Sequence, residues 1–171
     1  MSRQKPVSKL GLYAYGLAMV VLVLDQISKL WVLNGLHLVE RGQIPVLPIF
    51  RLTMVMNQGV SFGLLRADGP MGRWLLVGAA LAVVVGLILW VRRADRVLFA
   101  SAIGLIIGGA LGNNLIDRAR IGEVVDFLDF SALYFPWVFN IADSAISIGV
   151  VLLLLDSLTP AAREAQEPTT P

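Results

Sequence analysis

The 171-residue chain contains no cysteine, one histidine and few charged residues. Without cysteine it cannot form disulfides, thiol nucleophiles, thiolate-bound zinc sites or iron–sulfur clusters. With His37 as the sole imidazole, a Ser/His triad or a multi-histidine metal site is disfavoured. Only 15% of the residues are charged while 57% are hydrophobic, too little charge to cover a soluble domain. These shortages predict a membrane protein.

Four apolar runs can each supply the roughly 20 residues that a helix needs to cross a bilayer. They cover about residues 10–33, 74–91, 97–117 and 139–158. The first follows basic residues, as a secretory signal does, but no small-residue cleavage site follows it, so we expect an uncleaved helix. The predicted fold is an all-α membrane protein, one polytopic domain with four transmembrane helices. The tail, about residues 160–171, is expected to be disordered.

Basic residues predict the orientation of these helices. They crowd before the first run and between the second and third, at Arg3, Lys5, Lys9, Arg92, Arg93 and Arg96. The positive-inside rule therefore places both termini in the cytoplasm. Because the basic residues flank apolar runs, we expect the net charge of +2 to serve contact with membrane lipid and expect no nucleic acid partner.

Two segments, about residues 34–73 and 118–138, then lie on the outer side of the membrane, opposite the cytoplasm. In the first, Phe50–Asn57 alternates apolar and polar residues, the period of a strand with one apolar face. Asn57-Gln58-Gly59 is typical of a turn, and residues 60–65 can return as a second strand. We expect a small hairpin, or cradle, resting its apolar face on the membrane. In the second, residues 124–137 are expected to form a short interfacial segment.

A stripe of glycines marks the third apolar run. Gly104, Gly108 and Gly112 recur every four residues and lie on one face of a helix. Such a smooth stripe lets another helix approach closely.

Acidic residues in or beside the spans are candidates for function, because ionisable groups are costly there. They are Asp25, Asp117, Asp126, Asp129 and Asp143. Asp117 and Asp129 are expected to be solvated or structurally paired, with Arg118 and Arg120 close to Asp117. Asp25 has Lys29 four residues on, as a partner on the same helix face. A charge pair inside a membrane span nevertheless indicates that its residues line a functional site.

The strongest candidate is Asp143. Asn140, Asp143 and Ser147 form one polar face where the fourth span enters the bilayer. An interhelical hydrogen-bond stripe is an alternative explanation, but asparagine would suffice for that. In the predicted topology Asp126 and Asp143 lie at neighbouring outer helix ends and can meet. Two such carboxylates share protons, so that one acts as a base toward water while the other stays neutral. A dyad of the adjacent Ser28 and Lys29 is disfavoured, because helix neighbours point about 100° apart.

Ordered motifs resemble those of the bacterial lipoprotein signal peptidase (type II signal peptidase) family. They are DQISK at 25–29, NQGVSF at 57–62, GGALGNNLIDR at 108–118, VVDF at 124–127 and FNIADSAI at 139–146. The resemblance covers about residues 10–158. It implies a four-helix intramembrane aspartic endopeptidase of the bacterial inner membrane, with its active site near the periplasmic face. Such an enzyme removes signal peptides from diacylglyceryl-modified prolipoproteins, cutting before the lipidated cysteine.

The same resemblance implies roles for individual residues. Asp126 and Asp143 match the catalytic aspartates, and the substrate-binding or supporting positions fall on Asp25, Lys29, Asn57, Gly59, Asn113, Asn114, Arg118 and Asn140. Asn57 and Arg118 are expected to hydrogen-bond the substrate backbone, and Asp25 with Asn140 to hold the geometry. The family has one asparagine where this chain has two, so either Asn113 or Asn114 is the equivalent, and the extra residue predicts a local helix bulge.

No metal or organic cofactor is expected, and the protein is expected to be a monomer. A small proton-coupled transporter that uses Asp25, Asp117 and Asp143 as a relay is the alternative function. A non-catalytic assembly subunit that packs through the glycine stripe is a third.

Overall fold

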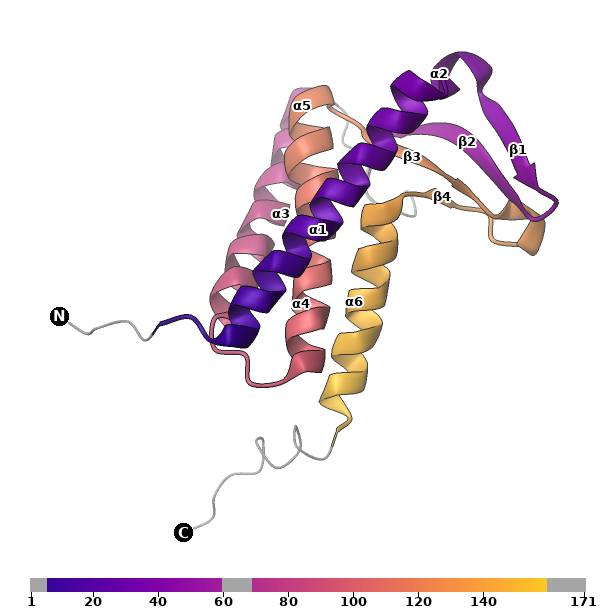
Figure 1. The fold of residues 1–171 in the computed structure, drawn as a ribbon. Helices are drawn as coiled ribbons and strands as arrows, with labels where there is room; N and C mark the ends of the chain where they lie inside the picture. The colour runs from indigo at the N-terminus through magenta and orange to yellow at the C-terminus, as the bar shows by residue number, and fades with distance from the viewer. Residues whose placement is uncertain (1–5, 60–68, 160–171) are drawn as a thin grey trace, which may run out of the picture.

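The computed structural model describes residues 6–59 and 69–159, and in it long helices lie side by side with a small sheet at one end (Figure 1). The long helices are α1 (Lys9–Leu30), α3 (Gly69–Val91), α4 (Val97–Ala110) and α6 (Ile141–Ser157). Two π-helical segments extend them, η1 (Trp31–Gly35) after α1 and η2 (Leu111–Arg118) after α4. The short helices are α2 (Leu38–Arg41), α5 (Ala119–Ile121) and the 3-10 turn η3 (Ser131–Leu133).

Three helices in the described residues are long and apolar enough to cross a membrane: Lys9–Gly35, Gly69–Val91 and Val97–Ile121. They coincide with the first three predicted spans, although the second begins at Gly69 rather than at Trp74. The fourth predicted span is occupied by α6, whose 17 residues rise only about 25 Å. Its crossing of the bilayer stays a prediction, as do the membrane sides of the two termini. The expected disorder of the tail lies outside the described residues.

The helix starts follow from local capping. Ser8 caps α1, where its hydroxyl accepts a hydrogen bond from the Gly11 amide. At the start of α6, Asn140 and Asp143 form a reciprocal capping box in which each side chain accepts a bond from the other residue's backbone N–H. The capping box fixes the direction of the Asp143 carboxylate, which matters below.

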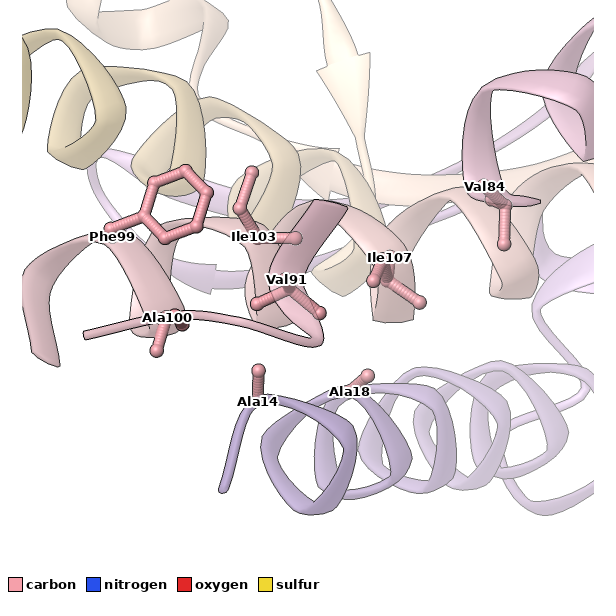
Figure 2. Close-up of a cluster of buried hydrophobic side chains, with 9 residues drawn as sticks. Ala14, Ala18, Val84, Val91, Phe99, Ala100, Ile103 and Ile107 are labelled. Carbon is pink, nitrogen blue, oxygen red and sulfur yellow. The ribbon is translucent and has the colours of Figure 1, made fainter. Parts of the chain in front are cut away.

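The helices pack around a cluster of small and branched side chains. Figure 2 shows Ala14 and Ala18 pointing from α1 toward the α3 and α4 members of this cluster, Val84, Val91, Phe99, Ala100, Ile103 and Ile107. The predicted glycine stripe is confirmed as the close-approach face. A Cβ on Gly104 would lie 2.7 Å from the Ala14 carbonyl oxygen, and one on Gly108 would lie 2.6 Å from that of Ala18.

The sheet has four antiparallel strands in the order β1-β2-β3-β4. They are β1 (Gln43–Leu47), β2 (Phe50–Asn57), β3 (Val124–Asp129) and β4 (Val138–Phe139). Two segments far apart in the sequence thus pair, with Val55 opposite Asp126 and Asn57 opposite Val124. The sheet therefore joins the two predicted periplasmic segments into one unit beside the start of α6 (Figure 1).

Phe50–Asn57 is a strand, as predicted, but its partners differ from the expected hairpin. It forms a hairpin with the preceding β1 and pairs on its other side with β3. The return strand expected at residues 60–65 lies outside the described residues. The expectation that the apolar face rests on the membrane is wrong for Leu52, which is buried against Val32 and Leu38. This face is covered because Val32 of η1 and Leu38 of α2 pack in the same buried cluster as Leu52.

Candidate active site

The carboxylate of Asp126 comes from β3, in the part of that strand beyond its pairing with β4 at Leu128 and Asp129. Strand alternation puts Asn57 and Asp126 on one face, and Asn57 Nδ2 donates to Asp126 Oδ2 over 3.0 Å. Asn140 Nδ2 donates to the other oxygen, Oδ1, over 2.7 Å. Burial and the neighbouring charge of Asp143 raise the pKa of Asp126 to about 7, against the lowering effect of these two hydrogen bonds. Asp126 can therefore keep its proton near neutral pH.

The second carboxylate, Asp143, lies in the first turn of α6. Its Oδ2 accepts the Asn140 backbone N–H over 3.2 Å, and its Oδ1 accepts Asn113 Nδ2 over 2.8 Å. Since Asn140 also bonds Asp126, a single residue ties both carboxylates to the same point of the fold. The two acids thus converge, as the topology predicted, and both line one cavity.

The buried ammonium group of Lys29 lies close to this pair and is linked to it through Asn113. Lys29 Nζ lies 2.7 Å from Asp25 Oδ2, the partner expected from their spacing, and 2.7 Å from Asp117 Oδ2. It also donates to Asn113 Oδ1 over 2.7 Å. Asn113 thus links the cation to Asp143 by one hydrogen bond on each side. Asp25 Oδ1 in turn accepts the backbone N–H of Ala142, which fixes α1 to the start of α6.

The two adjacent asparagines point in different directions. Asn113 faces Lys29 and Asp143, whereas Asn114 Nδ2 donates to the Ala110 carbonyl of its own helix. The predicted helix bulge is present as the π-helical turn η2, which carries both residues. The geometry therefore favours Asn113 as the asparagine that serves the site.

Arg118 reaches the turn after β2. Its guanidinium donates to the Gln58 and Gly59 carbonyls over 3.2 and 2.8 Å, and Asn57 Oδ1 accepts the Gly59 amide. Within the described part of the chain the buried Arg118 Nε has no hydrogen-bond partner. Arg118, Asn57 and Gly59 share a small hollow of about 130 Å³ with Asp143. The guanidinium therefore holds the turn after β2 in place.

The cavity beside the two carboxylates has a volume of about 650 Å³. Its wall combines Asn57, Asp126 and Asp143 with the aromatic Phe135, Trp137 and Phe139 and with Ser144 and Ser147 of α6. Phe135 packs edge-on against both Trp137 and Phe139. A polar end with a carboxylate pair and an apolar aromatic wall suit an extended apolar chain with a reactive amide.

Two acids serve structure. Asp117 was expected to pair with Arg118 or Arg120, but its salt bridge is to Lys29, and Gln26 donates to its other oxygen. Asp129 accepts bonds from Thr53 and the Ser131 amide, and Arg51 lies 3.5 Å away. Burial alone would raise the pKa of Asp129, but the Ser131 and Thr53 hydrogen bonds and the Arg51 charge hold it well below its usual range.

Sequence reasoning missed the contacts that Asp117 makes with Lys29 and Gln26. Asp117 lies on another helix, 91 residues from Gln26, and no periodicity within one helix reveals a contact between two helices. Also missed was the ion pair between Arg96 and buried Asp156, 2.9 Å apart at the opposite end of the bundle. An aspartate near the C-terminal end of an apolar helix was the available signal, since a buried charge needs a partner.

Comparisons with known proteins give one consistent family. A model of the signal peptidase (SPase) II family matches residues 17–159. The lipoprotein signal peptidase of Caulobacter vibrioides is 60% identical over 88% of this chain and 89% of its own, and that of Methylorubrum extorquens is 51% identical over 85% of each. A solved bacterial membrane enzyme superposes with a TM-score of 0.78 at 25% identity, covering 98% of this chain and 100% of its own. The chain therefore belongs to the signal peptidase II family, and so is a peptidase with membrane-spanning helices.

Proposed function

We propose that this protein is an intramembrane aspartic endopeptidase that releases the signal peptide from diacylglyceryl-modified prolipoproteins, cutting before the lipidated cysteine. The observation that carries the proposal is the convergence of Asp126 and Asp143 on Asn140 at the wall of an amphipathic cavity. The relatives named as lipoprotein signal peptidases supply the substrate class.

The two aspartates have different roles in the reaction. Asp143, at the N-terminus of α6 and bonded by Asn140 and Asn113, sits where the helix dipole favours a negative charge. It takes a proton from the attacking water, whose oxygen forms a bond to the scissile carbonyl carbon. Asp126, whose pKa of about 7 keeps a protonated fraction near neutral pH, donates its proton to the carbonyl oxygen. When the C–N bond breaks, the departing amine takes the proton that Asp143 accepted. As the C=O bond re-forms, a hydroxyl of the tetrahedral intermediate returns a proton to Asp126, so that both aspartates regain their starting states.

The residues around the pair have positioning roles. Lys29 compensates the buried charge of Asp25 and Asp117 and, through Asn113, orients the Asp143 oxygen that faces it. Asn57 and Arg118, beside the turn at Gly59, are placed to bond the substrate backbone. The lipid anchor of the substrate confines both partners to one membrane, which raises their effective concentration.

In this proposal the fourth helix crosses the bacterial inner membrane, both termini are cytoplasmic and the sheet lies at the periplasmic face. In support, α1 begins and α6 ends at the end of the bundle opposite the sheet, where the α3–α4 turn with its arginines also lies (Figure 1). The enzyme acts as a monomer and without a metal or organic cofactor. Chelator titration of the cleavage reaction and the mass of the detergent-solubilised protein test these last two statements.

The transporter hypothesis is less well supported. A proton relay needs acids spaced through the depth of the membrane. Asp25, Asp117 and Asp143 instead belong to one network around Lys29 and Asn113, and Asp156 at the other end of the bundle is paired with Arg96.

The deciding experiment incubates purified full-length protein in detergent with a lipidated prolipoprotein peptide and follows release of the signal segment. Asp126→Asn and Asp143→Asn should each lower the rate by roughly a thousandfold or more. Asp129→Asn, on the same strand as Asp126, is the matched control and should cleave. Thermal unfolding checks that each variant is folded. Full cleavage by either of the first two variants would overturn the proposal, and so would a wild type that transports protons without cutting.

A further inference from the structure

A second cavity lies at the end of the bundle opposite the sheet, around the turn between α3 and α4. It measures about 550 Å³, and its wall carries the arginines Arg92, Arg93 and Arg96 together with Leu89, Trp90 and Phe99. None of these residues takes part in the site described above. A cavity lined by both arginines and apolar side chains suits a ligand that is anionic at one end and apolar at the other.

The backbone of this turn is held from other helices. The Ser8 amide donates to the Arg92 carbonyl over 2.9 Å, and its hydroxyl donates to the Ala94 carbonyl over 2.8 Å. From α6, Asp156 pairs with Arg96 over 2.9 Å. The arginines therefore project from a fixed frame built by α1, α4 and α6, so that little order has to be gained when a ligand binds.

Among the described residues, the wall of the cavity carries three arginines and one aspartate, Asp95, whose side chain is 87% exposed to solvent. Asp156 pairs with one of the arginines, Arg96. No side chain caps the first turn of α4, whose N–H dipoles add to the positive field. Arg93 is itself exposed and extends this field toward the surface.

The aromatic residues indicate the depth in the membrane. Trp90 is 56% exposed and packs edge-on against Phe99, with ring centroids 4.8 Å apart. Exposed tryptophans at helix ends sit at the level of lipid headgroups, which is where a phosphate would meet the arginines. Basic pockets between helix ends are suited to lipid phosphate, because guanidinium groups bond phosphate oxygens in pairs.

We infer that this cavity binds the phosphate headgroup of an anionic phospholipid, with Arg92 and Arg93 at the phosphate and Leu89 and Trp90 along the glycerol and first acyl carbons. The site is separate from the carboxylate pair and does not depend on the peptidase proposal. Its role is to hold one lipid at the α3–α4 turn.

The test is native mass spectrometry of the full-length protein, released from detergent after titration with phosphatidylglycerol or with phosphatidylcholine. Wild type should retain one phosphatidylglycerol in preference to phosphatidylcholine. Arg93→Gln should weaken this retention about fivefold, and Arg92→Gln with Arg93→Gln further, since each basic residue near an anionic surface contributes a similar factor. Arg93→Lys should keep most of it, and Arg41→Gln, in the short helix α2 beside the sheet, is the matched control and should change nothing.

A parallel arm adds inorganic phosphate and follows thermal unfolding, which separates lipid from free anion. Phosphatidylglycerol should raise the unfolding temperature of wild type, while phosphate at the same concentration should not. Equal retention of the two lipids by wild type, unchanged retention by the double arginine variant, or stabilisation by phosphate alone would each overturn the inference.

Discussion

At the end of the bundle away from the sheet, α1 meets α4 through small residues and backbone, whereas beneath the sheet the same chain segments meet through charges. Gly104 and Gly108 of α4 lie against the carbonyls of Ala14 and Ala18. Farther along this interface, which we call the seam, Lys29 of α1 binds Asn113 and Asp117 of η2, the π-helical extension of α4. We call the part at Gly104 and Gly108 the packed end and the part at Lys29 the polar end. One helix pair thus changes its mode of contact within a few turns.

The difference follows from what each end has to do. Lipid tails are as apolar as the helices, so burial of apolar surface does not drive helices together in a membrane, and close packing has to supply the attraction. Such packing fixes a distance but leaves no reactive group. Charged contacts cost desolvation, yet they fix the directions of individual oxygen atoms. The polar end of the seam is therefore where carboxylates can be held in one orientation for reaction.

The largest effect is expected when the polar end loses its cation. Lys29→Met keeps most of the side-chain volume but leaves the carboxylates of Asp25 and Asp117, both buried, without their counter-charge. Breaking a buried ion pair in this way costs about 3–5 kcal/mol of unfolding free energy. Denaturant unfolding in detergent micelles, followed by tryptophan fluorescence, measures this loss.

Lys9→Met is the matched control, because Lys9 is exposed at the start of the same helix. Its free energy of unfolding should stay within about 0.5 kcal/mol of wild type. A Lys29→Met protein as stable as Lys9→Met would mean that the polar end of the seam is held by packing as well, and the contrast between the two ends would fail.

The helix contacts at the packed end could be predicted from the sequence, whereas those at the polar end could be predicted only in part. Gly104, Gly108 and Gly112 carry a periodicity that one helix displays by itself, and their role as an approach face is confirmed. The Asp25 and Lys29 pair also lies within one helix turn. The Lys29 and Asp117 contact joins residues of different helices, and the pairing of β2 with β3 joins strands separated in the sequence by α3, α4, η2 and α5. Contacts of this kind depend on the three-dimensional arrangement, which no local period encodes.

The site shows the same division. Asp126 and Asp143 stood out because acids beside apolar runs are costly, and their convergence followed from the topology. Asn140 joins the two acids because of the capping box at the start of α6. Asn113 rather than Asn114 faces Asp143 because of the π-helical turn η2. Motif spacing indicated the bulge without showing which asparagine it turns inward.

A methyl group at the packed end should have the next largest effect. In Gly104→Ala the new Cβ would lie 2.7 Å from the Ala14 carbonyl oxygen, so α1 and α4 have to separate. Overpacking of this kind costs about 1–3 kcal/mol of unfolding free energy. In the matched Gly86→Ala, where nothing lies within 4 Å of the added Cβ, stability should be equal or higher by up to about 1 kcal/mol. Equal stability of the two alanine variants in denaturant titrations would contradict the close packing.

A pH titration of the cleavage rate tests the protonation of Asp126 at the site. With its pKa at about 7, Asp126 loses its proton as pH rises through that value, and cleavage should then fall about tenfold per pH unit. The same shift makes folding less favourable as pH rises from about 4 to 7, because the folded state holds a proton that the unfolded state releases. Asn57→Ala removes a hydrogen bond that lowers this pKa, so the alkaline limb of the cleavage profile should move to higher pH. Thr53→Val is the control, because it alters the contact of Asp129 and should leave the alkaline limb in place. If the limb of Asn57→Ala also stayed in place, the assignment of the limb to Asp126 would be contradicted.

The smallest effect tests a neutral polar contact at the packed end. Ser8 caps α1 by accepting the Gly11 amide and donates its hydroxyl to the Ala94 carbonyl. Since no buried charge is left behind, Ser8→Ala should cost only about 1 kcal/mol of unfolding free energy, several times less than Lys29→Met. Ser157→Ala, whose hydroxyl bonds the Leu154 carbonyl at an exposed helix end, should cost less still in the same denaturant titration. A Ser8→Ala loss as large as that of Lys29→Met would show that the end away from the sheet also depends on directional polar contacts, and close packing would no longer distinguish it from the site.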